Sequence, residues 1–475
     1  MSIFAKYYLS AIPHNLNVGA VLARSPIEVD EHKKAPQKVL DKLHYTLGVL
    51  FWQYKKQRKD GHISSSDDCV RINAGALSDV VGNKYAKYIQ WLIKSGIIES
   101  NGSWQKLPNG KGKSTGFRYT EKYREGIRKP VMVYVYNDTI YRNVTKKAIC
   151  PKTKSKYQHQ YNFFKDLDYD DSEAERILNQ VYPHKEDQHK REIQIHRLNK
   201  IRYAGLDDVP VAPFHTGDTG RLYTPLSHLK SELRAALRYK GKPLVEVDIK
   251  SSIPWISTFL LCKEFIESKQ SVLPSYCSKL FSSNNSIYSS IDSYIMLSKK
   301  EGSSSTNEYK EDVCRYIEDV RTGDIYQLLA DLWNEKCGKS YDRHTAKKKF
   351  LSALNSPPHF ESPYKAIMSS QYPSVVEYFD KINGWFKTRK QKKAARMKGD
   401  KVDDYGKSGF AYLTQGLESD FLLNTLSECL EQKYPDMPFF TLHDAIYTTG
   451  VYNSTVRKMI EAESVKFFGV KIRLG

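Results

Sequence analysis

Apolar residues recur at helical spacing in the first quarter of the chain. In residues 36–60 nearly every third or fourth position is apolar, and the segment ends in a basic run. This pattern predicts an amphipathic helix with one buried face. Residues 73–81 and 85–96 repeat the pattern on either side of a Gly82-Asn83 break, so a short helix, a tight turn and a second helix are expected. Two β-rich runs around a Gly/Lys-rich stretch predict a hairpin over residues 97–119.

These elements together resemble a winged-helix module, which we expect as an N-terminal domain over residues 1–127. Its second helix carries Lys84 and Lys87, and the hairpin tip carries Lys111. Lysines in these places are candidates for contact with nucleic acid phosphates. Winged helices also bind proteins, so DNA binding by this module is one of two readings.

The middle of the chain changes character. A short β-like run at residues 131–136 leads into highly charged helical sequence up to residue 203. We expect residues 128–218 to form a helical connector or a reduced thumb. Further on, residues 281–310 are rich in serine and residues 387–401 in Lys and Arg, and both compositions are typical of exposed insertions.

Composition narrows the function classes. The 475 residues include 74 Lys and Arg against 54 Asp and Glu, a formal charge of +20, and the commonest partner of such a surface is the phosphate backbone of nucleic acid. The seven cysteines form no Cys-x-x-Cys pair, which argues against a zinc ribbon. The longest apolar stretch is far too short for a membrane span, and we find no secretory signal, so we expect a cytoplasmic protein that is not secreted.

Two segments of the C-terminal half bring carboxylates to strand ends. Residues 243–248 are an apolar strand that ends in Asp248, and residues 437–449 are two β-rich runs joined at His443-Asp444. If these strands are neighbours, the two carboxylates converge, and divalent cations are the usual relief of their repulsion. An aspartate at a strand end is also a common turn former, which is the structural alternative.

The order of motifs in this half is similar to that of family-A DNA polymerases. Thr219-Gly-Arg-Leu222 precedes the strand ending in Asp248, and a Gln-Gly-x-x-Ser-Asp run, residues 415–420, begins 28 residues before His443-Asp444. Single-subunit phage RNA polymerases also carry Gly-Arg-x-Tyr and His-Asp, and residues 220–223 fit both branches. The resemblance covers about residues 215–450. It implies an α+β right-hand polymerase with palm and fingers over residues 219–475.

The resemblance also implies roles for individual residues. Two Mg²⁺ ions, for which Mn²⁺ can substitute, would be held by Asp248, Asp444 and the backbone carbonyl of Ile249. The triphosphate would be bound by Arg343 and Lys347, which stand four residues apart on an expected fingers helix. The template-primer duplex would be contacted by Arg221 and Gln415, with His443 beside the primer end.

Three departures from the family pattern matter. Ile253 stands where family-A DNA polymerases place a glutamate against the sugar 2′ position, and Ala445 replaces a glutamate after His-Asp. The Tyr-Gly pair of the fingers helix falls on Asn355-Ser356. A bulky apolar Ile253 would exclude a 2′-hydroxyl by shape and offer it no hydrogen bond, which favours deoxynucleotides.

The sequence therefore predicts template-dependent nucleotidyl transfer from nucleoside triphosphates to a 3′-hydroxyl on a DNA template-primer. No spaced set of Asp-x-Glu carboxylates precedes Thr219, so the predicted DNA polymerase is a small one without a proofreading exonuclease. One alternative is a single-subunit RNA polymerase or primase-like enzyme. The other is a non-catalytic winged-helix replication initiator or DNA-binding regulator.

Overall fold

The structure is a computed structural model, and the chain folds into two units. The first unit comprises residues 1–215 and 223–244, and the second comprises residues 216–222 and 245–475. The residues that the structure describes are 6–29, 33–59, 69–102, 105–106, 112–113, 115–204, 210–217, 219–261, 265, 310–321, 323–338, 340–356, 358, 360–383 and 409–475. The two predicted insertions, apart from Lys310, lie outside these ranges, as does Lys111.

The first unit is built on a strand pair packed against one long helix. Strand β1 (Tyr8–Pro13) pairs antiparallel with β7 (Pro130–Val135), with Tyr8 opposite Val135. Helix α3 (Pro36–Lys59) packs on this pair so closely that a Cβ added at Gly48 would come within 2.0 Å of the Ser10 Oγ. Because β7 is tied to the start of the chain, the expected domain boundary at residue 127 does not coincide with a division between the units.

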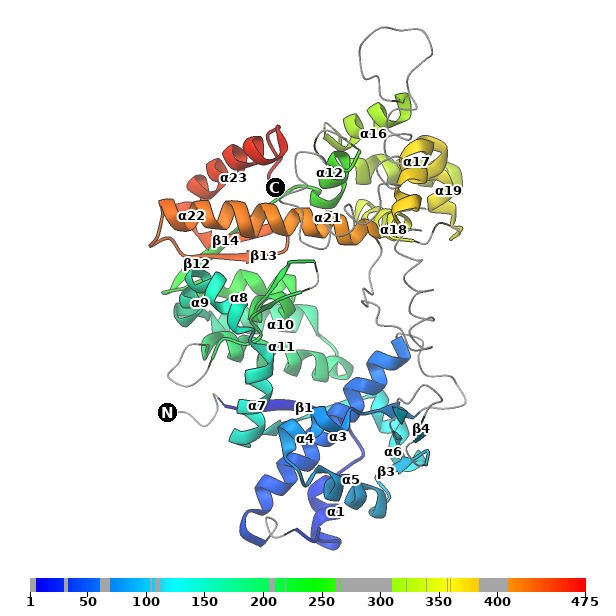
Figure 1. Ribbon diagram of the computed structural model, residues 1–475, viewed down its shortest axis with the longest axis vertical. Helices are drawn as coiled ribbons and strands as arrows, with labels where there is room; N and C mark the ends of the chain where they lie inside the picture. The colour runs from blue at the N-terminus through cyan, green and yellow to red at the C-terminus, as the bar shows by residue number, and fades with distance from the viewer. Residues whose placement is uncertain are drawn as a thin grey trace. The chain divides into compact units, whose positions relative to one another are not determined.

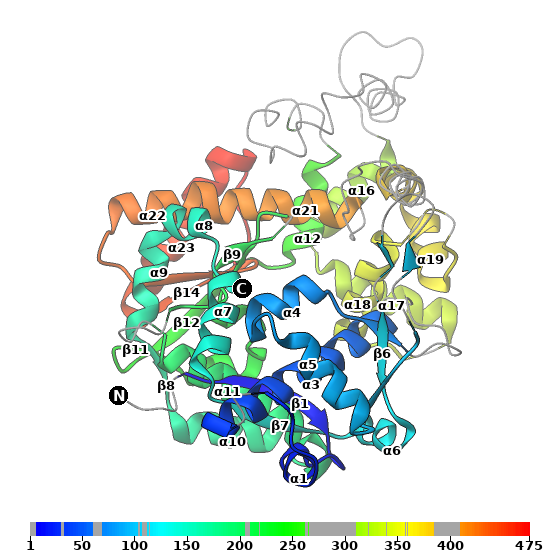
Figure 2. The same cartoon turned by 60° about the horizontal axis from the view of Figure 1, so that its bottom comes forward.

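The predicted helix–turn–helix is present in the first unit. Helices α4 (Ala74–Val81) and α5 (Tyr85–Lys94) follow each other and share a core with α3. The three-stranded sheet β2-β6-β3 lies next in this part of the chain, with β2 (Val70–Arg71), β3 (Ile98–Ser100) and β6 (Gly116–Tyr119). The predicted hairpin is confirmed by the β3–β6 pairing and by the β4 (Gln105–Lys106) to β5 (Gly112–Lys113) pairing. Figure 2 shows β6 together with the helices α3, α4 and α5.

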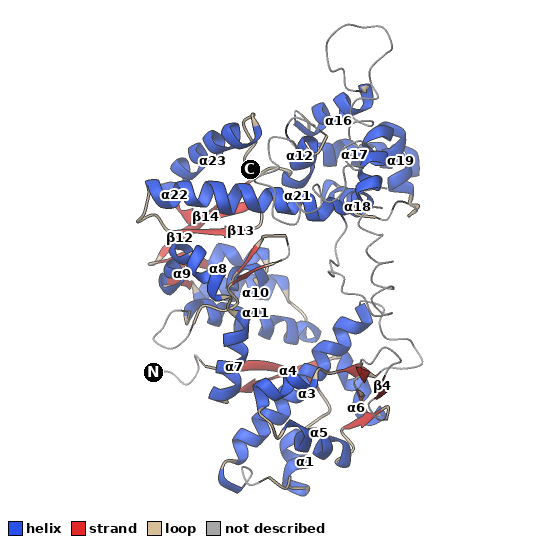
Figure 3. Ribbon diagram, in the orientation of Figure 1, coloured by secondary structure: helices blue, strands red, loops and turns tan. Residues whose placement is uncertain are grey.

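The remainder of the first unit is mostly helical (Figure 3). Helices here are α7 (Asp138–Ala148), α8 (Pro151–Lys156), α9 (Gln158–Phe163), α10 (Asp171–Val181) and α11 (Gln188–Arg202). Strand β11 (Leu237–Tyr239) pairs with β8 (Leu167–Tyr169) and with the start of β12 (Lys242–Asp248). The charged sequence from residue 172 to 203 thus forms the two helices α10 and α11, as its pattern predicts.

The second unit combines a strand hairpin with a large helical core. The end of β12 lies beside the hairpin of β13 (Phe439–Leu442) and β14 (Ala445–Thr449). One long helical stretch, α21 (Gly409–Ser419), a π-helical segment (Asp420–Leu426) and α22 (Ser427–Lys433), runs past this hairpin (Figure 1). Other helices of this unit are α12 (Ser252–Phe259), α16 (Glu311–Arg321), α17 (Ile325–Cys337), α18 (Arg343–Leu354), α19 (Pro363–Gln371) and α23 (Asn453–Phe468), and residues 373–383 are also helical.

One hydrophobic core joins most of these elements. It contains Trp255 and Phe259 of α12, Trp333 of α17, Phe350 of α18 and Phe468 of α23, each at most 5% exposed. No helix in the described ranges combines the length and the apolar character needed to cross a membrane.

Candidate active site

Asp248 and Asp444 end up at the ends of neighbouring strands. Asp248 is the last residue of β12, and His443-Asp444 is the turn between β13 and β14. In the sheet β12 is next to β14, and the Ile249 amide donates a hydrogen bond to the Asp444 carbonyl at 3.1 Å. The expected strand neighbours are therefore observed, and both aspartates are half-buried.

The backbone around both aspartates is constrained. Among the described residues only three non-glycine residues have positive φ, and two of them are Ser251 at 53° and His443 at 55°. Such left-handed conformations each cost on the order of 1–3 kcal/mol, and they are retained where surrounding structure determines them. Residues 473–475 run beside Asp248, with the Gly475 amide donating to the Asp248 carbonyl at 2.9 Å. The strand end at Asp248 and Ile249 is thus hydrogen-bonded both to Gly475 and to Asp444.

This anchoring also corrects the predicted helix after Asp248. The sequence pattern indicates a helical run from residue 249 to 262, whereas α12 extends only from Ser252 to Phe259. Ile249 forms a β-bridge with Leu474, and the Lys250 amide donates to the Arg473 carbonyl at 3.0 Å. Pairing with residues 473–475 occupies backbone hydrogen-bonding groups of residues 248–250, so a helix cannot begin there.

The electrostatics around Asp248 are dominated by negative charge. The pKa of the Asp248 carboxyl is raised to about 7, first by burial and then by the negative charges of Asp444 and Glu246. The Lys347 ammonium opposes this rise in pKa. Two carboxylates that share a partly desolvated site attract a divalent cation, because it relieves both the repulsion and the desolvation.

The side chains offer two carboxylates rather than a full metal cage. Within the described part of the chain no group of three or more His, Cys, Asp or Glu side chains could hold a metal ion. Two protein carboxylates are sufficient for Mg²⁺, because this ion keeps several waters and is commonly bound by one or two carboxylates together with substrate phosphates. The two aspartates therefore fit such an ion.

A third carboxylate, Glu418 on α21, lies near this site and was not anticipated. It is 1% exposed, and its Oε1 accepts hydrogen bonds from the Arg221 guanidinium, with the Nε at 2.8 Å. Its Oε2 accepts from the Ser252 hydroxyl at 2.6 Å. Burial raises the pKa of Glu418, the positive charge of Arg221 lowers it, and the charge of Asp444 raises it further. The sequence signal was only an acidic residue at a variable position of the Gln-Gly run.

Gln415 lies on α21, and Arg221 contacts the same part of this helix through Glu418. Gly220, with φ at 76°, brings the Gly-Arg turn so close to α21 that an added Cβ would stand 3.4 Å from the Ser419 Cβ. This turn directs Arg221 to Glu418. Gln415 is half-buried and stands three residues before Glu418, so both lie on one side of the helix.

The expected triphosphate residues share one face of α18. Asp342 caps this helix by accepting from the Thr345 amide at 2.8 Å. The Arg343 guanidinium lies 5.3 Å and the Lys347 ammonium 5.8 Å from the centre of the Tyr326 ring. Arg343 also donates to Asp324 at 2.6 Å. Spacing of four residues does place both cations on one side, as predicted.

Tyr326 of α17 is a further residue that sequence reasoning missed. It is 2% exposed, and burial raises the pKa of its hydroxyl, with a contribution from the charge of Asp444. The Tyr326 ring therefore lies close enough to Asp444 for its charge to affect the hydroxyl pKa, and Arg343 and Lys347 lie over the ring. Lys349 lies instead over Tyr364, at 4.7 Å.

Ile253 is the second residue of α12, directly after Ser252. Its side chain is half-buried and packs against the core of the second unit. Pro254 follows it within the first turn of the helix, where a proline is tolerated.

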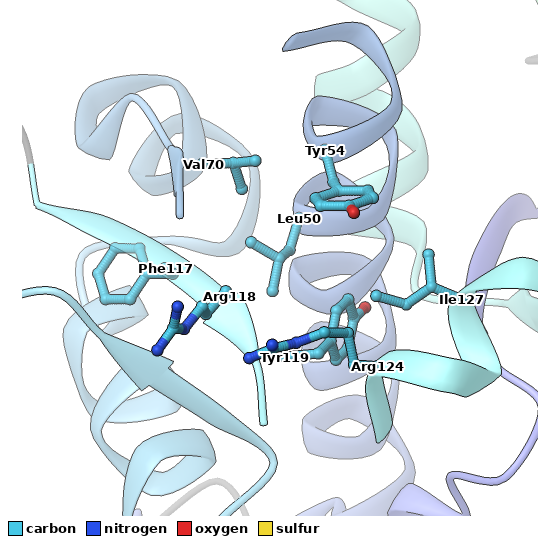
Figure 4. A pocket seen from close by; sticks show the side chains of 8 residues that line it. All are labelled: Leu50, Tyr54, Val70, Phe117, Arg118, Tyr119, Arg124 and Ile127. Atoms are coloured by element: carbon cyan, nitrogen blue, oxygen red, sulfur yellow. The ribbon is translucent and has the colours of Figure 1, made fainter. Parts of the chain in front are cut away.

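In the first unit, the expected nucleic-acid lysines are exposed where they are described. Lys84 precedes α5, and Lys87 lies in its first turn. A small pocket in this unit, shown in Figure 4, is mostly apolar. Its two arginines, Arg118 and Arg124, form ion pairs with Glu99 at 2.7 and 3.3 Å. The pocket is lined by Leu50, Tyr54, Val70, Phe117, Arg118, Tyr119, Arg124 and Ile127, which include neither a carboxylate nor a nucleophile.

Comparisons with known proteins give matches among solved structures, and none among family models or curated sequences. Among solved structures, the chain is similar to the POL domain of Pol1 from M. smegmatis in complex with DNA primer-template and dNTP, with a TM-score of 0.29 and 11% sequence identity. The match covers 64% of this chain and 54% of that chain, so the chain spans about half the length of this polymerase domain.

Proposed function

We propose that the protein catalyses template-dependent nucleotidyl transfer, adding deoxynucleoside triphosphates to the 3′-hydroxyl of a DNA primer. The observation that supports this most is the pairing of Asp248 and Asp444 at the ends of neighbouring strands. Burial and the negative charge of Asp444 raise the pKa of Asp248, and such a pair of partly buried carboxylates is typical of a site that binds cations.

In the proposed mechanism, Asp248 and Asp444 in their deprotonated forms would hold Mg²⁺ or Mn²⁺. The bound ions would supply charge neutralisation for transfer of the α-phosphoryl group. The Ile249 carbonyl, expected from the resemblance, is a third candidate ligand. Arg343 and Lys347 bind the triphosphate from the α18 face, where Tyr326 supports both side chains.

The duplex side of the site is assigned to different residues. Gln415 and Arg221 contact the template-primer duplex, and His443 lies beside the primer end. Arg221 does so from the Gly-Arg turn, which its ion pair with Glu418 holds in place. Ile253 lies one residue after Ser252 and is proposed to exclude a 2′-hydroxyl by its bulk. Phosphoryl transfer depends mostly on positioning and charge neutralisation, so a constrained backbone around Asp248 and Asp444 suits this chemistry.

One assay tests the proposal. Purified protein is given a primed DNA template and Mg²⁺, with dNTPs and NTPs in separate reactions. We expect extension with dNTPs, and a loss of at least about a thousandfold in Asp248→Ala and Asp444→Ala, because either change removes half of the cation site. Extension only with NTPs would identify an RNA polymerase or a primase-like enzyme.

Two outcomes would contradict the proposal itself. One is unchanged extension by either aspartate variant, which would show that the carboxylates are not catalytic. The other is tight DNA binding by the wild-type protein with no extension in any reaction, which would favour a DNA-binding regulator.

A further inference from the structure

A cluster of aromatic and basic side chains lies in the first unit, at helix α11. The loop that follows β10 (Leu222–Tyr223) is attached to this helix by two hydrogen bonds. The Lys230 amide donates to the Gln194 side chain at 3.1 Å, and the Arg197 guanidinium donates to the His228 carbonyl. The attachment fixes the position of His228 relative to Arg197.

Three aromatic rings are stacked at this place. His215 and Tyr223 are nearly parallel, with centroids 5.3 Å apart and planes 16° apart. Tyr223 and His228 continue the stack at 6.5 Å and 27°. His228 is exposed at its outer end. We call His215, Tyr223 and His228 the ring stack, and all three residues belong to the first unit.

The ring stack is accompanied by two basic side chains, Arg197 and Lys200, and no described carboxylate forms an ion pair with either. The pKa of Lys200 is lowered by burial and by the charge of Arg197, and the pKa of Arg197 is lowered mainly by burial. The pKa of His228 is lowered by burial and then by Arg197, His215 and Lys200. No carboxylate contributes to any of these shifts, and in the described chain neither cation has an ion pair with one. A partly desolvated cation pair of this kind is stabilised by an incoming anion.

Further aromatic rings contact α11 through His196. His196 lies 4.9 Å from the ring of Tyr7, and Tyr7 lies 5.0 Å from Tyr134. Tyr134 and Tyr136 are stacked at 6.1 Å and are 42% and 38% exposed. His196 shares α11 with Arg197 and Lys200, and aromatic rings near basic side chains are the composition of single-strand binding surfaces.

We propose that the ring stack, together with Arg197 and Lys200, is a binding site for single-stranded nucleic acid. An unpaired base stacks on the exposed His228 ring, and the neighbouring phosphates lie against the Arg197 and Lys200 side chains. Duplex DNA fits less well, because its base faces are already covered by neighbouring bases. The proposal does not rest on the polymerase function and holds whether or not the aspartate site catalyses.

The test measures binding of a fluorescein-labelled oligothymidine of about 15 nucleotides to the full-length protein, without nucleotides or metal, over a range of salt concentrations. His228→Ala removes the exposed ring, and we expect affinity to fall about five- to a hundredfold, the usual effect of losing one stacking partner. Lys200→Ala should weaken binding and make the salt dependence shallower by about 0.7, the value for one phosphate contact on a single strand.

Matched variants distinguish binding at this site from a general effect of the net charge. Lys190→Ala changes the same helix by the same charge, but Lys190 is exposed and pairs with Asp187 at 2.7 Å, so we expect less than about a twofold change. Lys200→Arg keeps the charge and should retain most of the affinity. Thermal unfolding of each variant verifies that it is folded.

Three results would overturn the proposal. Equal losses from Lys190→Ala and Lys200→Ala would show that only net charge matters, and an unaffected His228→Ala would show that no base stacks there. Competition by polyglutamate as strong as that by unlabelled oligothymidine would show a non-selective anion surface. Should the polymerase proposal fail, primer extension would be absent while these binding differences remained.

Discussion

Arg221 and Glu418 form a buried ion pair although 197 residues separate them in the sequence. The guanidinium is 17% and the carboxylate 1% exposed, and the second carboxylate oxygen is taken by Ser252. The pair therefore joins the Gly-Arg turn, the first turn of α12 and the long helix α21. All three carry residues assigned to the candidate active site, so the pair fixes their relative positions.

Removing the charge of one partner of this pair should lower the free energy of unfolding. In Glu418→Gln the buried guanidinium loses its counter-charge, and we expect a loss of about 3 kcal/mol in unfolding free energy together with impaired primer extension. Glu173→Gln is the matched control, since Glu173 pairs with Arg176 on the surface, where such pairs contribute about 1 kcal/mol or less. Thermal and urea unfolding measure both. If Arg221→Met combined with Glu418→Met is less stable than either single variant, the pair is not the reason for the loss.

Metal binding should be visible as stabilisation. A ligand present at about 100 times its dissociation constant stabilises a folded protein by about 2.7 kcal/mol, so Mg²⁺ should raise the melting temperature of the wild-type protein. Asp248→Asn removes one charge of a repelling, partly buried pair, so it should melt higher than wild type in EDTA and respond little to Mg²⁺. Asp436→Asn, at an exposed turn position, should behave like wild type. A full Mg²⁺ response in Asp248→Asn would place the metal elsewhere.

Lys347 should act on the nucleotide rather than on DNA. Its ammonium lies over Tyr326 and influences the pKa of Asp248, so Lys347→Ala should raise the KM for dNTP or lower kcat, by about ten- to a hundredfold in kcat/KM. Lys348→Ala, the next residue on α18 and equally exposed, is the matched control and should change kcat/KM by less than about threefold. Equal effects of the two variants, or a change confined to DNA affinity, would remove Lys347 from the triphosphate site.

Some of this architecture is readable from the sequence because it depends on local pattern. Apolar runs that stop at Asp248 and at His443-Asp444 predicted two strand ends, and the structure has them side by side. The spacing of Arg343 and Lys347 predicted one helix face, because helical periodicity alone determines it. The helices α3, α4 and α5 were predicted for the same reason.

Other features depend on contacts between distant residues and leave no local signal. In the sequence, Glu418 does not differ from other acidic residues. Its role depends on the contact with Arg221, which residues 415–420 alone do not predict. The pairing of residues 249 and 474 shortens the helix predicted after Asp248. Likewise the β1–β7 pair connects residues on both sides of the expected boundary at residue 127.

The first unit should lose stability in mild acid through His44. Burial lowers the pKa of this histidine from its ordinary 6.5 to about 4. The unfolded state therefore binds the proton more readily, so stability is complete above about pH 6.5 and is lost as the pH falls towards 4, by up to about 3 kcal/mol. Melting temperatures between pH 7 and 4 measure this loss. His44→Gln should remove the His44 part of this loss and leave the part due to His196 and His228, whose pKa values burial also lowers. His184→Gln, at an exposed position, should leave the profile unchanged. Identical profiles for both variants would show that His44 does not contribute.

Sugar selection should depend on Ile253. The side chain follows Ser252, whose hydroxyl is fixed on Glu418, and precedes Pro254, whose ring limits how far the first turn of α12 can yield. Ile253→Ala removes the bulky side chain without loosening the backbone as glycine would. The kcat/KM for ribonucleotides relative to deoxynucleotides should therefore rise about ten- to a hundredfold. This rise is equivalent to a loss of about 1.4–2.7 kcal/mol of discrimination. Ile317→Ala, a half-buried isoleucine of α16 that packs on the same core, controls for lost packing and should leave the ratio unchanged. A wild-type protein that already prefers ribonucleotides, or a ratio that moves equally in both variants, would show that Ile253 does not exclude the 2′-hydroxyl.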